Sequence, residues 1–147
     1  MNFVSPCEGK IFNIEKFSDE IIASKAMGDG FGVVLSGNEI VAPIKGEVKV
    51  LYPTGHAICL EGDDGTQLMI HIGIDSFSIQ GMNVAHVKVG DKVDVGDKLI
   101  TTNVKELIEK TGNSETAVVF LNGEKITLLQ DDVDIKCLQE DIIKIEK

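Results

Sequence analysis

Short apolar runs separated by turn-forming clusters dominate this sequence. Runs rich in Val, Ile and Phe alternate with clusters of Gly, Pro, Asn and Asp about every 8 to 12 residues, which is typical of an all-β sandwich or barrel. The expected strands are Phe31 to Leu35, Ile40 to Ala42, Glu47 to Tyr52, His56 to Glu61, Thr66 to Ile74, Val84 to Val89 and Ala117 to Leu121.

One segment carries the signals of a short helix. Asn103 can cap a helix that runs from Val104 to Lys110, and Gly112 follows its end. Glu106 stands at the reciprocal position of a capping box. We therefore expect one helix within an otherwise β fold.

A weak internal repeat suggests a duplicated β unit. The segment Ser5 to Ile11 parallels the segment Ala42 to Val48, 37 residues later. A second echo, Gly90-Asp91-Lys92-Val93 followed by Gly96-Asp97-Lys98-Leu99, predicts two tight turns that bracket a very short strand.

Composition limits the class of protein. A chain of 147 residues and 15.9 kDa suits a single domain over residues 1–147, and no apolar run is long enough to span a bilayer. We expect a cytoplasmic protein without direct membrane insertion. Three cysteines without C-x-x-C spacing favour neither a disulfide framework nor a thiolate metal site.

The acidic net charge disfavours nucleic-acid binding. The net charge is -10, and the basic residues are all lysines, so the sequence lacks arginine for bidentate phosphate contacts. A protein partner with a basic patch fits this balance better.

Two histidines, His56 and His71, flank one tight turn, Gly62-Asp63-Asp64-Gly65. If the two aspartates form a two-residue hairpin loop, the histidines lie opposite each other with Cβ atoms roughly 4.5 to 5.5 Å apart. An Asp64-Gly65 loop makes them diagonal neighbours, whereas a one-residue bulge would separate them. Two unrelated surface imidazoles are the alternative.

Strand alternation assigns the two faces of this hairpin. The core face comprises Ala57, Cys59, Leu68, Ile70, Ile72 and Ile74, and the other face comprises His56, Ile58, Leu60, Gln67, Met69, His71 and Gly73. The histidines then emerge among apolar neighbours such as Ile58 and Met69, as expected of a docking patch around a reactive centre. Gly73 would leave room beside His71, and Thr54 could orient His56 through its hydroxyl group.

Imidazole can act as nucleophile, acid or base near neutral pH. A zinc hydrolase needs three protein ligands, but neither H-E-x-x-H nor H-x-H occurs. The G-x-S-x-G elbow of a serine hydrolase is absent, and Gly28-Asp29-Gly30-Phe31-Gly32 is too irregular for a dinucleotide or Walker loop. Phosphoryl relay needs only a nucleophilic imidazole, a second imidazole that stabilises phosphate, and a surface that accepts proteins.

Six segments together carry a family resemblance, and the most specific is G-x-x-apolar-apolar-apolar-H-I-G-I-D around His71. They are Ala23 to Gly30, Val41 to Gly46, Thr54 to Ala57, Gly65 to Asp75, Val89 to Val93 and Gly96 to Ile100. Over about Ser5 to Leu121 the chain resembles the glucose-type enzyme IIA (EIIA) of the bacterial phosphoenolpyruvate-dependent sugar phosphotransferase system.

The resemblance implies a phosphotransferase component. His71 would take a phosphoryl group from the phosphocarrier protein HPr and pass it to a cysteine of the sugar-specific enzyme IIB, with His56 as an electrostatic partner positioned by Thr54. Asp29 and Asp75 would lie near the site and suit a basic donor surface. The implied fold is a compact β-sandwich, or barrel-sandwich hybrid, with duplicated topology and one or two short helices. The relay requires no cofactor.

The chain departs from the family pattern at some positions. Ser76 stands where threonine is common, Ala117 replaces a frequent proline, and the resemblance does not explain the tail after Leu121.

Two rival functions stay open. A zinc-dependent regulatory module would use His56 and His71 as metal ligands. A biotinyl or lipoyl carrier would suit the Gly-Asp turns, but the sequence lacks the carrier lysine in an M-K-M-type hairpin.

Overall fold

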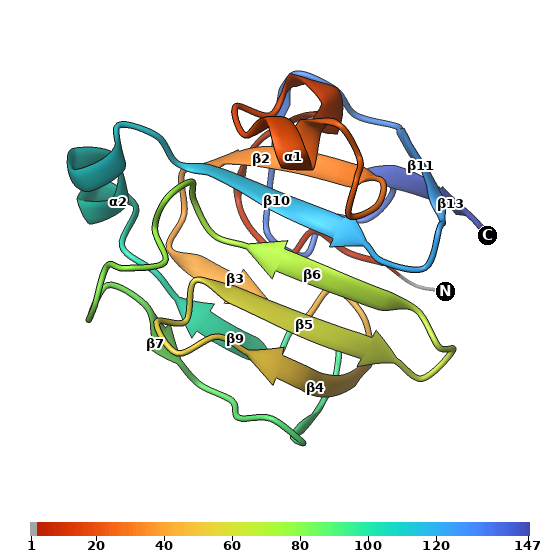
Figure 1. The fold of residues 1–147 in the computed structure, drawn as a ribbon. Helices are drawn as coiled ribbons and strands as arrows, with labels where there is room; N and C mark the ends of the chain where they lie inside the picture. Colours follow the sequence, from red (N-terminus) through yellow and green to blue (C-terminus); the bar gives the residue numbers. More distant parts are fainter. Residues whose placement is uncertain (1–2) are drawn as a thin grey trace.

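Eight antiparallel strands form the main sheet of the computed structural model, which describes residues 3–147. In spatial order they are β12 (Val133–Ile135), β1 (Gly9–Asn13), β2 (Gly30–Leu35), β10 (Glu115–Phe120), β6 (Gln67–His71), β5 (Ala57–Gly62), β4 (Gly46–Leu51) and β8 (Lys92–Val93). A second sheet contains β3 (Glu39–Val41), β9 (Lys98–Thr101) and β7 (Val84–Ala85), and β11 (Lys125–Leu128) pairs with β13 (Ile143–Glu146). Figure 1 shows β3 and β9 behind the main sheet.

The main sheet buries apolar side chains on both faces. One face contributes Ile58, Leu68 and Ile70 to a large core that also contains Leu99 and Ile100 of β9. The opposite face packs a smaller cluster against the segment that carries a 3-10 turn (η1, Ile14–Lys16) and a short helix (α1, Glu20–Ala23). Figure 1 shows α1 over β2 and β10. The predicted all-β sandwich is confirmed.

Most expected strands form with small shifts at their ends, but two are shorter than predicted. β6 stops at His71 because the chain then turns through Gly73 and Asp75, which have φ angles of 75° and 54°. The expected strand Val84 to Val89 is reduced to the two residues of β7. None of the helices within residues 3–147 has the length and apolar character needed to cross a bilayer.

The predicted helix is present as α2 (Val104–Thr111). The Asn103 side chain accepts a hydrogen bond from the Glu106 backbone N–H at 3.0 Å, and Gly112 ends the helix with a φ of 78°. The Glu106 carboxylate forms an ion pair with Lys110 at 2.8 Å. Both helix ends therefore follow the sequence signals.

The internal repeat corresponds to a reciprocal exchange between two loops. The Pro6 carbonyl accepts a hydrogen bond from Val41 N–H at 2.8 Å, and the Pro43 carbonyl accepts one from Val4 N–H at 3.1 Å. Each loop therefore satisfies backbone groups of the other half of the chain. The predicted duplication of a β unit is confirmed.

The tail beyond Leu121 contains a second copy of the Gly-Asp turns. Asp132 N–H donates to the Ile11 carbonyl at 2.8 Å, as Gly90 N–H donates to the Val48 carbonyl at 2.8 Å. Farther along, the Leu138 N–H donates to the carbonyl of Ser5, and the equivalent N–H of Gly96 donates to the carbonyl of Ala42, both at 2.9 Å. The tail thus supplies one half of the fold with the turns that the other half takes from residues 90–97.

Candidate functional site

The hairpin between β5 and β6 has a three-residue loop. Gly62 N–H donates to the Thr66 carbonyl at 2.7 Å, and Gly65 adopts a φ of 89°. A type I turn followed by a glycine in this conformation is a common three-residue hairpin connection. The resulting register places His71 opposite Ala57, so neither of the two-residue loops considered from the sequence occurs.

This register reverses the predicted faces of β5. Ile58 is 0% exposed and packs in the large core, whereas Cys59 lies with Met69 on the opposite face. A one-residue change of register moves every side chain of a strand to the other face. The prediction that Ile58 contacts a partner is therefore wrong, and Met69 keeps its predicted place beside the histidines.

The two histidine rings nevertheless lie in edge-to-face contact. Their centroids are 5.3 Å apart and their planes are inclined by 79°. His56 lies in the turn before β5, directly after Gly55 with its φ of 71°, so strand alternation does not determine the direction of its side chain. The His56 carbonyl accepts a hydrogen bond from Ile72 N–H at 2.6 Å, which holds the turn beside the end of β6.

The protonation of His71 is fixed by one backbone acceptor. Its Nδ1 lies 3.0 Å from the carbonyl oxygen of Gly73. A carbonyl oxygen only accepts, so Nδ1 carries a proton and the neutral ring has its lone pair on Nε2. Burial lowers the pKa of His71 from its usual value, opposed in part by the Gly73 carbonyl and the nearby Asp19 carboxylate. This environment favours the neutral ring that a nucleophile requires.

His56 is oriented by a hydroxyl group, as the sequence predicts. Its Nδ1 lies 2.7 Å from Thr54 Oγ1, and the Thr54 carbonyl in turn accepts a hydrogen bond from Asn83 Nδ2 at 3.3 Å. The Tyr52 ring lies against the imidazole with a centroid separation of 5.2 Å. Burial, followed by the proximity of His71, lowers the pKa of His56.

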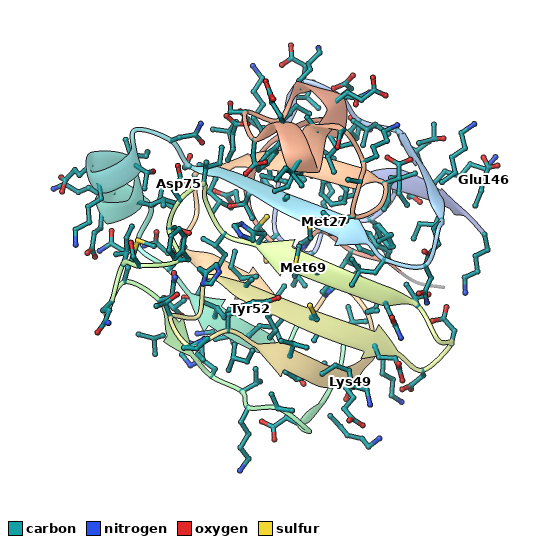
Figure 2. The ribbon with its side chains drawn as sticks, in the orientation of Figure 1. Met27, Lys49, Tyr52, Met69, Asp75 and Glu146 are labelled. Carbon is teal, nitrogen blue, oxygen red and sulfur yellow. The ribbon has the colours of Figure 1, made fainter. Side chains whose placement is uncertain are left out.

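A shallow hollow of about 300 Å³ contains both histidines. Its remaining lining residues come from α1 and its flanks, from the turn after β4 and from β6, and they are Asp19, Ile21, Ile22, Met27, Tyr52 and Met69. Figure 2 shows Met27, Met69 and Tyr52 in succession across this side of the molecule. The rim is apolar and accessible, because the side chain of Ile21 is 65% exposed.

Asp19 is a site residue that the sequence reasoning missed. It is the N-cap of α1 and accepts hydrogen bonds from the backbone N–H groups of Ile21 and Ile22. The sequence Ser18-Asp19-Glu20 before two isoleucines is a recognisable helix start. That signal, combined with the position of α1 over the sheet, brings one carboxylate to the hollow.

The two predicted acidic residues occupy different environments. Asp29 accepts hydrogen bonds from Gly30 N–H and Ile126 N–H, both at 2.9 Å, and is not among the residues of the hollow. Asp29 therefore fastens β11 to β2, and its predicted contact with a partner protein stays a prediction. Asp75 is exposed and lines a neighbouring depression with Lys110 of α2. Figure 2 places Asp75 to one side of Tyr52 and Met69.

Gly73 has a different role from the predicted one. It is buried, and a Cβ atom added to it would lie 2.7 Å from Leu107 Cδ1. The space beside it is therefore filled by α2 and is closed to a ligand or partner. Its carbonyl group, which orients His71, is the part that serves the site.

The described residues contain no cluster of three or more His, Cys, Asp or Glu side chains suited to a metal ion. Zinc sites in proteins use at least three protein ligands, so His56 and His71 alone would leave a zinc ion incompletely held.

Comparison with known proteins identifies the family. Residues 1–126 match the family described as phosphoenolpyruvate-dependent sugar phosphotransferase system, EIIA 1. The chain belongs to this family. The glucose-specific EIIA component of Oceanobacillus iheyensis is 37% identical over 124 residues, which cover 84% of this chain and 75% of the relative. The corresponding component of Halalkalibacterium halodurans is 36% identical over 127 residues, covering 86% of this chain and 73% of that protein.

The fold of this EIIA protein matches that of a solved relative. The structure of glucose permease IIA from Mycoplasma capricolum superimposes with a TM-score of 0.88 at 26% identity, covering 97% of this chain and 94% of the other. The chain is a phosphoryl carrier of the sugar phosphotransferase system, with HPr as donor and an enzyme IIB domain as acceptor. The biotinyl or lipoyl alternative is not favoured, since the matching family and the relatives are phosphotransferase components.

Proposed function

We propose that His71 Nε2 is the atom that carries the phosphoryl group. The observation that supports this most directly is the hydrogen bond from His71 Nδ1 to the Gly73 carbonyl at 3.0 Å. This bond leaves Nε2 as the nitrogen with a lone pair, in a ring at the edge of an accessible hollow. Burial keeps the ring neutral and so keeps the lone pair available.

The transfer steps balance without a cofactor. The lone pair of His71 Nε2 attacks phosphorus on phospho-HPr, and the bond between phosphorus and the donor atom of HPr breaks with its electron pair remaining on HPr. The Nδ1 proton stays on Nδ1, where the Gly73 carbonyl stabilises the positive charge of the phosphorylated ring. A cysteine thiolate of enzyme IIB then attacks phosphorus, and the electron pair returns to Nε2.

His56 acts as a hydrogen-bond donor to the phosphoryl group. When the Thr54 hydroxyl donates to His56 Nδ1 across their 2.7 Å separation, the proton of the neutral imidazole must lie on Nε2. The edge-to-face arrangement of the rings, with centroids 5.3 Å apart, brings His56 within reach of a phosphoryl group on His71. Thr54 therefore sets the tautomer of His56 as Gly73 sets that of His71.

Both protein partners dock on the rim of the hollow. Exposed apolar side chains such as Ile21 supply the centre of the contact, and Asp19 and Asp75 supply negative charge for basic residues of HPr. The relatives at 36–37% identity are glucose-specific components, which supports a glucose-class permease as the source of enzyme IIB. Since these partners act on the inner side of the membrane, we place the protein in the cytoplasm.

A zinc-dependent regulatory module is the competing use of the same two side chains. Relay requires no metal, whereas zinc would need further ligands from outside the described residues. Zinc titration of the unphosphorylated wild-type chain, with His71→Ala and His56→Gln as controls that each remove one ligand, separates the two functions, because relay predicts no zinc-dependent change in folding or partner binding in any of the three.

The decisive experiment is intact-mass analysis after incubation with phosphoenolpyruvate, enzyme I and HPr. One acid-labile, base-stable phosphoryl group should be added to the wild-type chain and none to His71→Ala. The variant His56→Ala serves as the matched control, because it removes an imidazole from the same hollow. Labelling that survives in His71→Ala and disappears in His56→Ala would reverse the two roles.

A further inference from the structure

Helix α2 packs on the turn that orients His71. Leu107 is the buried residue of this helix, and it is fully enclosed in the large core. A Cβ atom added to Gly73 would lie 2.7 Å from Leu107 Cδ1 and 3.3 Å from its Cδ2. The leucine side chain therefore rests directly against the glycine Cα, at the end of the molecule where β6 finishes (Figure 1).

The same turn is held from two other sides. Gly73 N–H donates to Thr116 Oγ1 of β10 at 3.4 Å, and the Ser76 hydroxyl donates to the Ile72 carbonyl. Thr116 and Ser76 are both fully buried. The long Gly73 hydrogen bond is a weak restraint. The contact with Leu107 adds a third restraint on this turn, from the side of α2.

That peptide group contains the carbonyl oxygen that accepts the His71 Nδ1 proton. We propose that Leu107 is a positioning residue for phosphoryl transfer, acting through the Gly73 carbonyl on the tautomer of His71. The inference rests on the proposed role of His71 Nε2 as acceptor. It assigns to α2, which contributes no lining residue to the hollow, the function of keeping the nucleophilic lone pair on the reacting nitrogen.

An unconstrained neutral imidazole can carry its proton on either ring nitrogen, so the tautomer of His71 depends on the acceptor at Nδ1. If Leu107 is shortened, the Gly73 peptide gains space to rotate and Nδ1 loses its acceptor. The neutral ring then populates the tautomer with the proton on Nε2, which has no lone pair for attack on phosphorus. The reacting fraction of His71 falls although every group that touches phosphate is still present.

The test uses Leu107→Ala in the full chain, with Leu99→Ala as its control. Leu99 is a fully buried leucine of the same core on β9, so both variants create a cavity. The first readout is the ¹⁵N NMR signature of the His71 tautomer at pH 7.5. The second is the single-turnover rate of phosphorylation by phospho-HPr. The tautomer measurement involves no phosphoryl transfer. It therefore tests the effect of Leu107 on the His71 ring even if His71 is not the acceptor.

In Leu107→Ala the Nδ1–H signature should weaken and the rate should fall at least about tenfold, because small displacements of a reacting group cost up to about a hundredfold. Leu107→Met, which conserves side-chain volume, should restore both. If Leu107→Ala does not fold, Leu107→Val provides the same comparison. Retention of the wild-type tautomer in a folded Leu107 variant, or an equal loss of rate in Leu99→Ala, would overturn the proposal.

Discussion

Asp29 and His56 occupy equivalent positions in the two halves of the main sheet. Asp29 precedes β2 and its carbonyl accepts a hydrogen bond from Phe120 N–H at 2.8 Å, and His56 precedes β5 and its carbonyl accepts one from Ile72 N–H at 2.6 Å. The Asp29 carboxylate accepts a hydrogen bond from the backbone N–H of Ile126 in β11, whereas the His56 ring lines an open hollow. One half of the duplicated fold therefore carries the chemistry and the other carries a structural contact.

This difference predicts that Asp29→Ala is a stability variant. Removing the carboxylate leaves the Gly30 and Ile126 N–H groups without their acceptor, which should lower the free energy of unfolding by about 1 to 3 kcal/mol. Urea unfolding measures the loss. Phosphorylation of the folded fraction by HPr should keep the wild-type rate, and a slower rate for that fraction would return Asp29 to the docking surface.

Asp75→Lys should have the opposite profile. Its side chain is exposed beside the hollow, so the substitution should leave unfolding nearly unchanged. Reversal of charge should slow the encounter with a basic HPr surface, and added salt should reduce the difference from wild type. Rates measured from low to high ionic strength test this. A defect that persists unchanged at high salt would argue against electrostatic docking.

His56→Gln should separate acceptance of phosphate from its delivery. Glutamine supplies a donor but not the ring that Thr54 and Tyr52 hold in place. The variant should still be phosphorylated at His71, yet its transfer to enzyme IIB should lose on the order of 2 to 4 kcal/mol of transition-state stabilisation. Quenched-flow measurement of a single turnover gives this rate. Delivery at the wild-type rate would leave His56 without a role in relay.

Two isoleucines on opposite sides of the sheet offer a test of the docking face. Ile58→Ala should cost about 2 to 5 kcal/mol of stability, because the side chain is fully buried in the core. Ile21→Asp should leave stability nearly unchanged and raise the KM for phospho-HPr, since Ile21 is exposed on the rim of the hollow. Wild-type kinetics in Ile21→Asp would place the HPr contact elsewhere.

The two histidines should make stability depend on pH. Burial lowers the pKa of both groups below the usual value of 6.5, so the unfolded chain binds more protons than the folded chain between the folded and unfolded pKa values. Their contribution is complete above about pH 6.5 and is lost as the pH falls toward the folded values. NMR titration should give midpoints below 6.5, and His71→Ala should flatten the pH dependence of urea unfolding. A midpoint above 6.5 for His71 would contradict this.

The histidine pair was predictable even though the hairpin register was not. The Asp63-Asp64-Gly65 segment suits loops of two or three residues, and the choice depends on Gly65 taking a positive φ of 89° within the folded hairpin. The resulting shift removed Ile58 from the predicted docking face. The shift did not separate His56 from His71, because His56 lies outside the strand and is positioned by Thr54 and the preceding turn.

The tail gave no comparable signal in the sequence. Its turns depend on Asp132 and Leu138, which adopt φ angles of 59° and 71° where the other half of the fold uses Gly90 and Gly96. Non-glycine residues adopt this conformation uncommonly, and a leucine does so only when surrounding contacts impose it. The hydrogen bonds to the Ile11 and Ser5 carbonyls are such contacts, and they involve residues more than a hundred positions away. Local pattern reasoning therefore could not detect the second copy.

The position of β10 between β2 and β6 also sets the order in which this protein can acquire its structure during synthesis. Strand β10 (residues 115–120) joins the two halves of the main sheet. The pairing of β2 and β6 with it cannot occur until β10 has been synthesised, long after both of those strands. Pairings across such sequence distances slow folding and prolong the exposure of unpaired strand edges. A nascent chain released before Phe120 would therefore present two open sheet edges, and it is this intermediate that chaperones in the cell would have to protect.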